Sequence, residues 1–210
     1  LSKRMLDFLV VKNVKLVGIG CNTISSVLGF LAPQYDLKLI GAIDPYIGHI
    51  AKLSIKKFGL IATPFTVKTR YYNNSLAKLN RDIEIIGQGC PRLATIIDQG
   101  NYTKEEIALE TKIPMANIKE KGAQDTVILA CTHYPIIMDY LQELYPDTTF
   151  INPAHYQALA IKDYLLEQDL LNEKETGGRV KVFTTGKREN YRWFLNKLGI
   201  KNVESINKVE

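Results

Sequence analysis

Short apolar runs that alternate with helical patterns constrain the fold of this chain more than any other feature. The runs are rich in Val and Ile and show no polar alternation, which is typical of strands buried on both faces of a parallel sheet. Helical patterns separate them, so the sequence predicts an α/β fold. The strand-like runs are residues 16–20, 37–43, 60–63, 83–86, 126–130, 149–152 and 180–185. The helical patterns are residues 5–11, 47–58, 67–79, 104–110, 136–144, 154–166 and 188–198.

Two segments repeat one design, in which a predicted strand ends at a cysteine and a helix follows. Residues 16–20 lead into Cys21-Asn22-Thr23, and residues 127–130 lead into Cys131-Thr132-His133. In open parallel α/β sheets, ligands bind in the crevice beyond the carboxyl ends of the strands. We therefore expect both thiols to reach one bound molecule from opposite sides, an arrangement that indicates proton transfer.

The repeat also predicts two lobes that each own one of the cysteine-ending strands. One lobe would hold residues 47–151, and the other would join residues 1–46 to residues 152–210. A surface turn is expected at residues 172–178, where a charged run precedes two glycines.

Composition excludes several classes of protein. The net charge of +5 comes from Lys and Arg scattered among Asp and Glu, which favours anionic small molecules and no nucleic acid. The 3 cysteines are widely spaced, which argues against a disulfide scaffold and closely spaced zinc ligands, and for a reducing compartment. We find no signal peptide and no apolar run near about 18 residues, so we expect a cytoplasmic protein without a membrane partner.

A cysteine at a strand-to-helix turn is well placed to act as a base. A free thiol has a pKa of about 8.5, so little thiolate is present near neutrality. The N–H groups and positive dipole end of the following helix favour the thiolate. Lowering the pKa by about two units requires about 2.7 kcal/mol, which such donors and a nearby His133 could supply.

The other polar residues of the two turns have both a structural and a functional interpretation. His133 could protonate or orient a reacting group, or be a turn residue satisfied by the backbone. Asn22, Thr23 and Thr132 could cap helices, or hold the carboxylates of an anionic ligand.

Two further patterns carry less chemistry. Cys90 follows a predicted Gly87-Gln88-Gly89 turn with no base beside it, which favours a structural thiol. The Gly18-Ile19-Gly20 run lacks the third glycine of a dinucleotide fingerprint, because position 23 is Thr, so we do not expect nucleotide binding.

Taken together, four segments resemble the cofactor-independent glutamate racemases of the aspartate/glutamate racemase superfamily. They are Cys21-Asn22-Thr23, Cys131-Thr132-His133-Tyr134-Pro135, Cys90-Pro91 and Val182-Phe183-Thr184-Thr185-Gly186, and the resemblance covers residues 5–198. Aspartate racemases usually carry an acidic residue where His133 stands, so the match favours glutamate.

The resemblance implies two pseudo-symmetric lobes, each a mainly parallel sheet flanked by helices, that close over glutamate. It implies a two-base reaction without pyridoxal phosphate or a metal, which would supply D-glutamate for peptidoglycan synthesis. Cys21 would act on the α-carbon of D-glutamate and Cys131 on that of L-glutamate, with His133 assisting Cys131. By the same resemblance, the substrate would be held by Asn22, Thr23, Thr132, His133 and Thr66.

The sequence also departs from the family pattern. Members usually begin with a strand ending in Asp-Ser-Gly and then a Pro-Tyr-Gly segment, and neither precedes Met5 here. Pro45-Tyr46-Ile47-Gly48 looks similar to the second of these but follows the second strand. A lobe without that first strand would expose a sheet edge or an apolar face, which predicts low stability or a homodimer.

Two alternatives stay open at this point. The chain could racemise or isomerise another small acid, such as aspartate, a hydantoin or maleate, which a substrate panel would distinguish. It could also be a truncated, non-catalytic relative that binds an amino acid without exchanging its α-proton.

Overall fold

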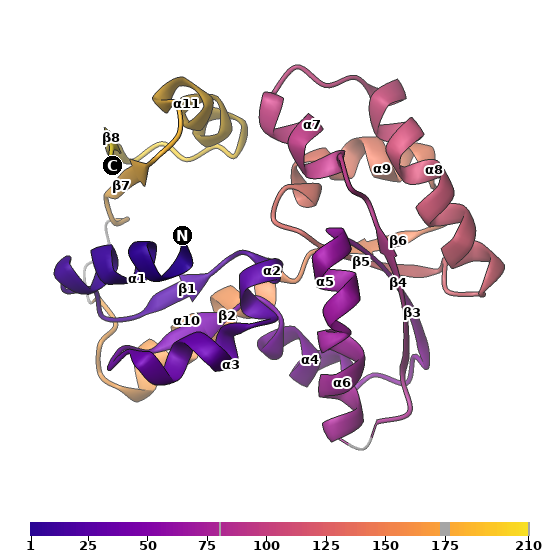
Figure 1. Ribbon diagram of the computed structural model, residues 1–210, viewed down its shortest axis with the longest axis horizontal. Helices are drawn as coiled ribbons and strands as arrows, with labels where there is room; N and C mark the ends of the chain where they lie inside the picture. The colour runs from indigo at the N-terminus through magenta and orange to yellow at the C-terminus, as the bar shows by residue number, and fades with distance from the viewer. Residues whose placement is uncertain (80, 173–176, 210) are drawn as a thin grey trace.

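The chain folds as an α/β protein whose paired strands are all parallel among the described residues. The computed structural model describes residues 1–79, 81–172 and 177–209, so the predicted turn at residues 172–178 lies mostly outside them. Figure 1 shows two parts, with helices packed against parallel sheets in each. The predicted class, α/β with parallel sheets flanked by helices, is confirmed.

One part is built on a four-stranded sheet in the order β4-β3-β5-β6. Its strands are β3 (Lys57–Ala62), β4 (Glu84–Gly89), β5 (Thr126–Ala130) and β6 (Thr149–Ile151). The central strands are buried on both faces, because each face has its own apolar cluster. The helices of this part are α4 (Asp44–Ile50), α5 (Pro64–Thr69), α6 (Tyr71–Lys78), α7 (Leu93–Gln99), α8 (Lys104–Glu120) and α9 (Met138–Leu144). The sheet therefore holds the end of β5, where Cys131 follows, in a rigid frame.

The other part holds a two-stranded sheet of β1 (Val17–Ile19) and β2 (Leu39–Gly41). Its helices are α1 (Ser2–Val11), α2 (Asn22–Ser25), α3 (Leu28–Leu31) and α10 (Ala154–Glu167), with a 3₁₀ turn at Ala32–Gln34. The buried side chain of Gln157 on α10 donates to the carbonyl of Ile19 at 3.0 Å and to that of Ile40 at 2.8 Å. One amide thus ties together the carboxyl ends of both strands.

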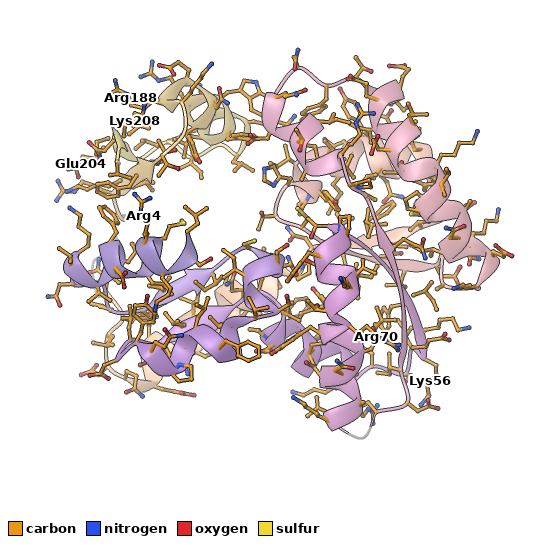
Figure 2. All side chains as sticks on the ribbon, in the orientation of Figure 1. Arg4, Lys56, Arg70, Arg188, Glu204 and Lys208 are labelled. Carbon is orange, nitrogen blue, oxygen red and sulfur yellow. The ribbon has the colours of Figure 1, made fainter. Side chains whose placement is uncertain are left out.

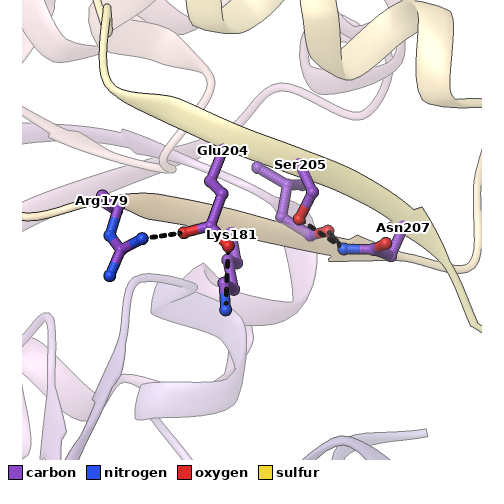
Figure 3. Close-up of polar contacts among 6 residues, drawn as sticks. Arg179, Lys181, Glu204, Ser205 and Asn207 are labelled. Atoms are coloured by element: carbon purple, nitrogen blue, oxygen red, sulfur yellow. Dashed lines mark hydrogen bonds and ion pairs between the residues drawn. The ribbon is translucent and has the colours of Figure 1, made fainter.

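A third sheet comes from the end of the chain, with β7 (Val180–Thr184), α11 (Arg188–Lys197) and β8 (Val203–Lys208). Glu204 of β8 forms ion pairs with Arg179 at 3.5 Å and Lys181 at 3.1 Å across the strand pair (Figure 3). The sequence did not predict β8. The predicted first lobe thus contains two separate two-stranded sheets, and the lobe boundaries and the homodimer stay predictions.

Charged side chains are spread over both parts. Figure 2 shows Arg4, Arg188 and Lys208 around the third sheet, whereas Lys56 and Arg70 lie on the four-stranded part. Across the part of the chain that the structure describes, no helix has the length and apolar character needed to cross a bilayer.

Several predicted elements differ from the structure in their bounds; the helix predicted at 104–110, for example, continues to Glu120 as α8. The helix predicted at 67–79 is interrupted at Arg70, whose left-handed φ of 51° ends α5 and begins α6. The helix predicted at 47–58 ends at Ile50, and Phe58 lies buried in β3. Gly87-Gln88-Gly89, predicted as a turn, belongs to β4, because it pairs with residues 60–62 of β3.

Gly59 is the position in the sheet with the least room for a side chain. A Cβ there would lie 2.7 Å from Cγ2 of Ile118, 2.8 Å from Cγ2 of Val127 and 2.9 Å from the carbonyl oxygen of Ala123. We predict that Gly59→Ala lowers the free energy of unfolding by about 1–3 kcal/mol, measured by urea denaturation. Gly48→Ala is the control, because nothing lies within 4 Å of its Cβ. Equal urea midpoints for Gly59→Ala and the parent chain would contradict the prediction.

Candidate active site

The two cysteine turns lie side by side at the carboxyl ends of β1 and β5. Cys21 precedes α2 in an extended conformation, with only Gly20 between it and the end of β1, and Cys131 directly follows β5. A Cβ built on Gly20 would lie 3.5 Å from Cγ2 of Thr132, so the two turns are in contact. The charge of Cys21 also raises the pKa of Cys131. The structure therefore brings together the two thiols that the sequence pattern paired.

The environment of Cys131 differs from the one expected. Burial raises the pKa of its thiol, the backbone N–H groups of His133 and Tyr134 lower it, and the charge of Cys21 raises it. The N–H donors act in the predicted direction, but burial outweighs them, because the residue is only 8% exposed. The Cys131 thiol therefore ionises less readily than an ordinary cysteine.

His133 lies between that thiol and a carboxylate that the sequence did not single out. Its Nδ1 is 3.8 Å from Sγ of Cys131, and its Nε2 is 3.6 Å from Oδ1 of Asp98 on α7. At these distances, Nδ1 can take the thiol proton, and the carboxylate would stabilise the imidazolium that this creates. The ring of Phe194 on α11 meets the imidazole edge to face, with centroids 6.3 Å apart. His133 thus connects the four-stranded part with the end of the chain.

Three threonine hydroxyls form a closed hydrogen-bonded ring beside the Cys21 turn. Oγ1 of Thr23 lies 2.9 Å from that of Thr63 and 3.0 Å from that of Thr66, and the last two are 3.0 Å apart. Thr63 also caps α5, because its Oγ1 accepts from the backbone N–H of Thr66. Thr63 was not among the predicted residues, although a Thr followed by Pro64 is a recognisable helix start. The ring presents short donors that can turn toward an anionic ligand.

Asn22 is held by a residue from the neighbouring part of the molecule. Its side chain is 4% exposed, and its Oδ1 accepts a 2.7 Å hydrogen bond from the hydroxyl of Tyr72 on α6. Thr132, by contrast, is exposed at the end of β5. Asn22, Thr23 and Thr66 therefore gather at the Cys21 turn, whereas Thr132 and His133 accompany Cys131.

Cys90 has the environment of a structural thiol. It is 1% exposed in the apolar cluster, and burial, followed by the charges of Glu110 and Cys131, raises its pKa to about 12. The hydroxyl of Tyr134 donates to its carbonyl at 3.3 Å. It is chemically inert beside the two turn cysteines.

A cavity of about 780 Å³ lies between α11 and β8, and its lining residues include neither cysteine turn. Its volume alone does not make this cavity a candidate active site. The convergence of thiols, imidazole, hydroxyls and amide at the strand ends identifies the candidate site.

Comparisons with known proteins agree on one family. Residues 4–160 match the model of the Asp/Glu/Hydantoin racemase family. The glutamate racemase of Thermoanaerobacter sp. (strain X514) is 32% identical over an alignment of 212 positions, which covers 100% of this chain and 78% of the relative. The crystal structure of glutamate racemase from Francisella tularensis subsp. tularensis SCHU S4 in complex with D-glutamate has a TM-score of 0.84 at 25% identity, covering 97% of this chain and 76% of that one. The crystal structure of glutamate racemase isoform RacE1 from Bacillus anthracis has a TM-score of 0.81 at 26% identity, covering 98% of this chain and 77% of that one.

Proposed function

The chain belongs to the Asp/Glu/hydantoin racemase family and is therefore an isomerase of the racemase type, and from that premise we propose that it interconverts L- and D-glutamate. The single observation that supports this best is the contact between the two cysteine turns at the ends of β1 and β5. The product would supply peptidoglycan synthesis with D-glutamate.

The proposed reaction is a two-base proton transfer. With L-glutamate, the Cys131 thiolate takes the α-proton while the Cys21 thiol delivers a proton to the opposite face. With D-glutamate, the roles are exchanged. A single base would return the proton to the face it left, whereas two bases on opposite faces invert the carbon. Because the α-proton is weakly acidic, the site must stabilise the developing carbanion with preorganised donors.

The remaining residues are proposed to bind the substrate and prepare the thiols. His133 accepts the proton of Cys131 through Nδ1, supported by the short distance between them and by Asp98 on its other nitrogen. The substrate carboxylates and ammonium are held by Asn22, Thr23, Thr132, His133 and Thr66, and the hydroxyl ring supplies donors without a net charge.

We also propose that residues 1–46 with 152–210 and residues 47–151 act as two lobes that enclose the substrate. Two sets of hydrogen bonds support this, since Asn22 and Thr23 of the first lobe bond to Tyr72, Thr63 and Thr66 of the second.

The decisive experiment follows the loss of optical activity from pure L-glutamate, and separately from pure D-glutamate, with the purified chain. Both signals should decay to zero at the racemic mixture. L-aspartate and a substituted hydantoin are assayed in parallel by the same signal, and maleate, which is achiral, by the change in ultraviolet absorbance on conversion to fumarate. Turnover of one of these acids without turnover of glutamate would replace the proposed substrate, and glutamate binding in calorimetry without turnover would indicate a binding module.

The two thiols predict a characteristic pH profile. Catalysis needs one thiolate and one thiol, so kcat/KM should rise as the pair loses its first proton and fall as it loses its second. Burial and the charge of Cys21 raise the pKa of Cys131, so the second loss occurs at higher pH than for an ordinary thiol. We expect the falling limb to lie above about pH 8.5, the usual thiol value. Initial rates from about pH 6 to 10.5 measure it, and a falling limb below about pH 8 would contradict this assignment.

A further inference from the structure

A buried hydrogen bond joins the hydroxyl of Tyr72 to the side-chain amide of Asn22, next to Cys21. The 2.7 Å bond is buried, with Tyr72 2% exposed and Asn22 4% exposed. It joins α6 to the first residue of α2, directly after Cys21. Among the described residues, the Tyr72 hydroxyl has no other hydrogen-bond partner.

The chemistry of the two groups fixes how the amide of Asn22 is turned. Burial, then the nearby Tyr46 and the charge of Asp44, raise the pKa of Tyr72, so its hydroxyl stays a neutral donor. An asparagine amide offers an acceptor oxygen on one side and two N–H donors on the other. If the amide turned over, the buried Tyr72 proton would lose its acceptor, which is unfavourable. Oδ1 therefore faces Tyr72, and the N–H donors have no hydrogen-bond partner within the described part of the chain.

We propose that Tyr72 is a positioning residue, which orients the Asn22 amide so that it presents only N–H donors to a substrate carboxylate. This inference rests on the proposed function, in which Asn22 contacts the substrate. Tyr72 itself does not touch the reacting atoms. Its effect crosses from one proposed lobe to the other, because α6 and α2 belong to different lobes.

Tyr72→Phe removes only the hydroxyl oxygen and keeps the ring in the core. The released amide can then present its oxygen to the carboxylate, which repels it. Because the carboxylate is bound in both the ground state and the transition state, KM for glutamate should rise about tenfold with kcat changed less than about twofold.

Tyr46→Phe is the matched control. Tyr46 is 0% exposed in the same apolar cluster, but its hydroxyl has no hydrogen-bond partner among the described residues. Its removal should leave KM unchanged. Asn22→Asp tests whether the N–H donors of Asn22 bind the substrate carboxylate, because it keeps an acceptor for Tyr72 but lacks these donors. The KM of Asn22→Asp should rise at least as much as that of Tyr72→Phe.

A double-variant cycle separates positioning from general damage. If Tyr72 acts through Asn22, then Asn22→Ala combined with Tyr72→Phe should have the same KM as Asn22→Ala alone. Multiplied losses in the double variant, or an unchanged KM in Tyr72→Phe, would overturn the proposal.

An NMR measurement decides the point without relying on turnover. In the full chain labelled with ¹⁵N-asparagine, the side-chain amide pair of Asn22 is identified by its absence from Asn22→Ala. Tyr72→Phe should shift this pair, and Tyr46→Phe should leave it in place. An unshifted pair in Tyr72→Phe would overturn the orienting role, whereas a shifted pair in a chain that does not racemise glutamate would contradict only the proposed function.

Discussion

Replacing Cys131 or Cys21 by Ala is expected to lower kcat/KM for glutamate racemisation by about 10³-fold or more. Each thiol is the base in one direction of the reaction and the acid in the other, so the loss of either thiol slows both directions. Because the enantiomers have equal free energies, kcat/KM must fall equally for L- and D-glutamate. Polarimetric initial rates with each pure enantiomer measure both values.

Cys90→Ala is the control for that prediction. It removes a thiol of the same chain that is buried in the apolar cluster and takes no part in the proposed reaction. It should keep the parent kcat/KM, although its small cavity should lower stability by about 1 kcal/mol. Full rates in both Cys21→Ala and Cys131→Ala would show that the two-thiol scheme is wrong.

Replacing His133 by Ala is expected to lower kcat about 10²- to 10³-fold. Burial raises the pKa of Cys131 and so disfavours its thiolate, and Nδ1 of His133 lies 3.8 Å from Sγ, where it can take the thiol proton. Asp98→Asn should cost less, about tenfold, because the Asp98 side chain is 61% exposed and solvent screens its charge. Initial rates under saturating L-glutamate measure both effects.

His155→Ala is the matched histidine control. His155 lies exposed on α10 against Tyr156, at a centroid distance of 5.4 Å, and among the described residues no hydrogen bond, ion pair or ring contact joins it to either cysteine turn. Its kcat should equal that of the parent chain. If His133→Ala lowered kcat no further than His155→Ala, the proton-accepting role of His133 would be excluded.

The sequence predicted the layered fold because buried parallel strands leave a local signature. Val127, Ile128 and Leu129 form an uninterrupted apolar run, and each is at most 1% exposed. The glycines of β4 predict a turn when only the sequence is considered, because the residues that require glycine at these positions lie elsewhere in the chain. A Cβ on Gly87 would meet Val67 at 3.2 Å, and one on Gly89 would meet Pro64 at 3.2 Å, since α5 packs directly on this strand.

Only those residues of the candidate site that directly follow a predicted strand could be predicted from the sequence. The chain direction places Cys21 and Cys131 each at the carboxyl end of a parallel strand. Because β1 and β5 belong to separate sheets, however, it is the packing of the two parts that brings the cysteine turns into contact, and no local pattern encodes that packing. Asp98 and Tyr72 reach the site from separate helices, and no local pattern distinguishes them from surface or core residues. The raised pKa of Cys131 was missed for the same reason, because burial depends on distant residues that pack around it.

The central claim is that two thiols face one α-carbon from opposite sides, and the measurement that tests it most directly is the initial reaction of each enantiomer in D₂O. Proton NMR follows the α-position of product and remaining substrate. The account predicts that newly formed D-glutamate carries deuterium while the remaining L-glutamate keeps its proton, and the reverse from D-glutamate. Product that retains the substrate's own proton, or substrate that gains deuterium as fast as product forms, would contradict it.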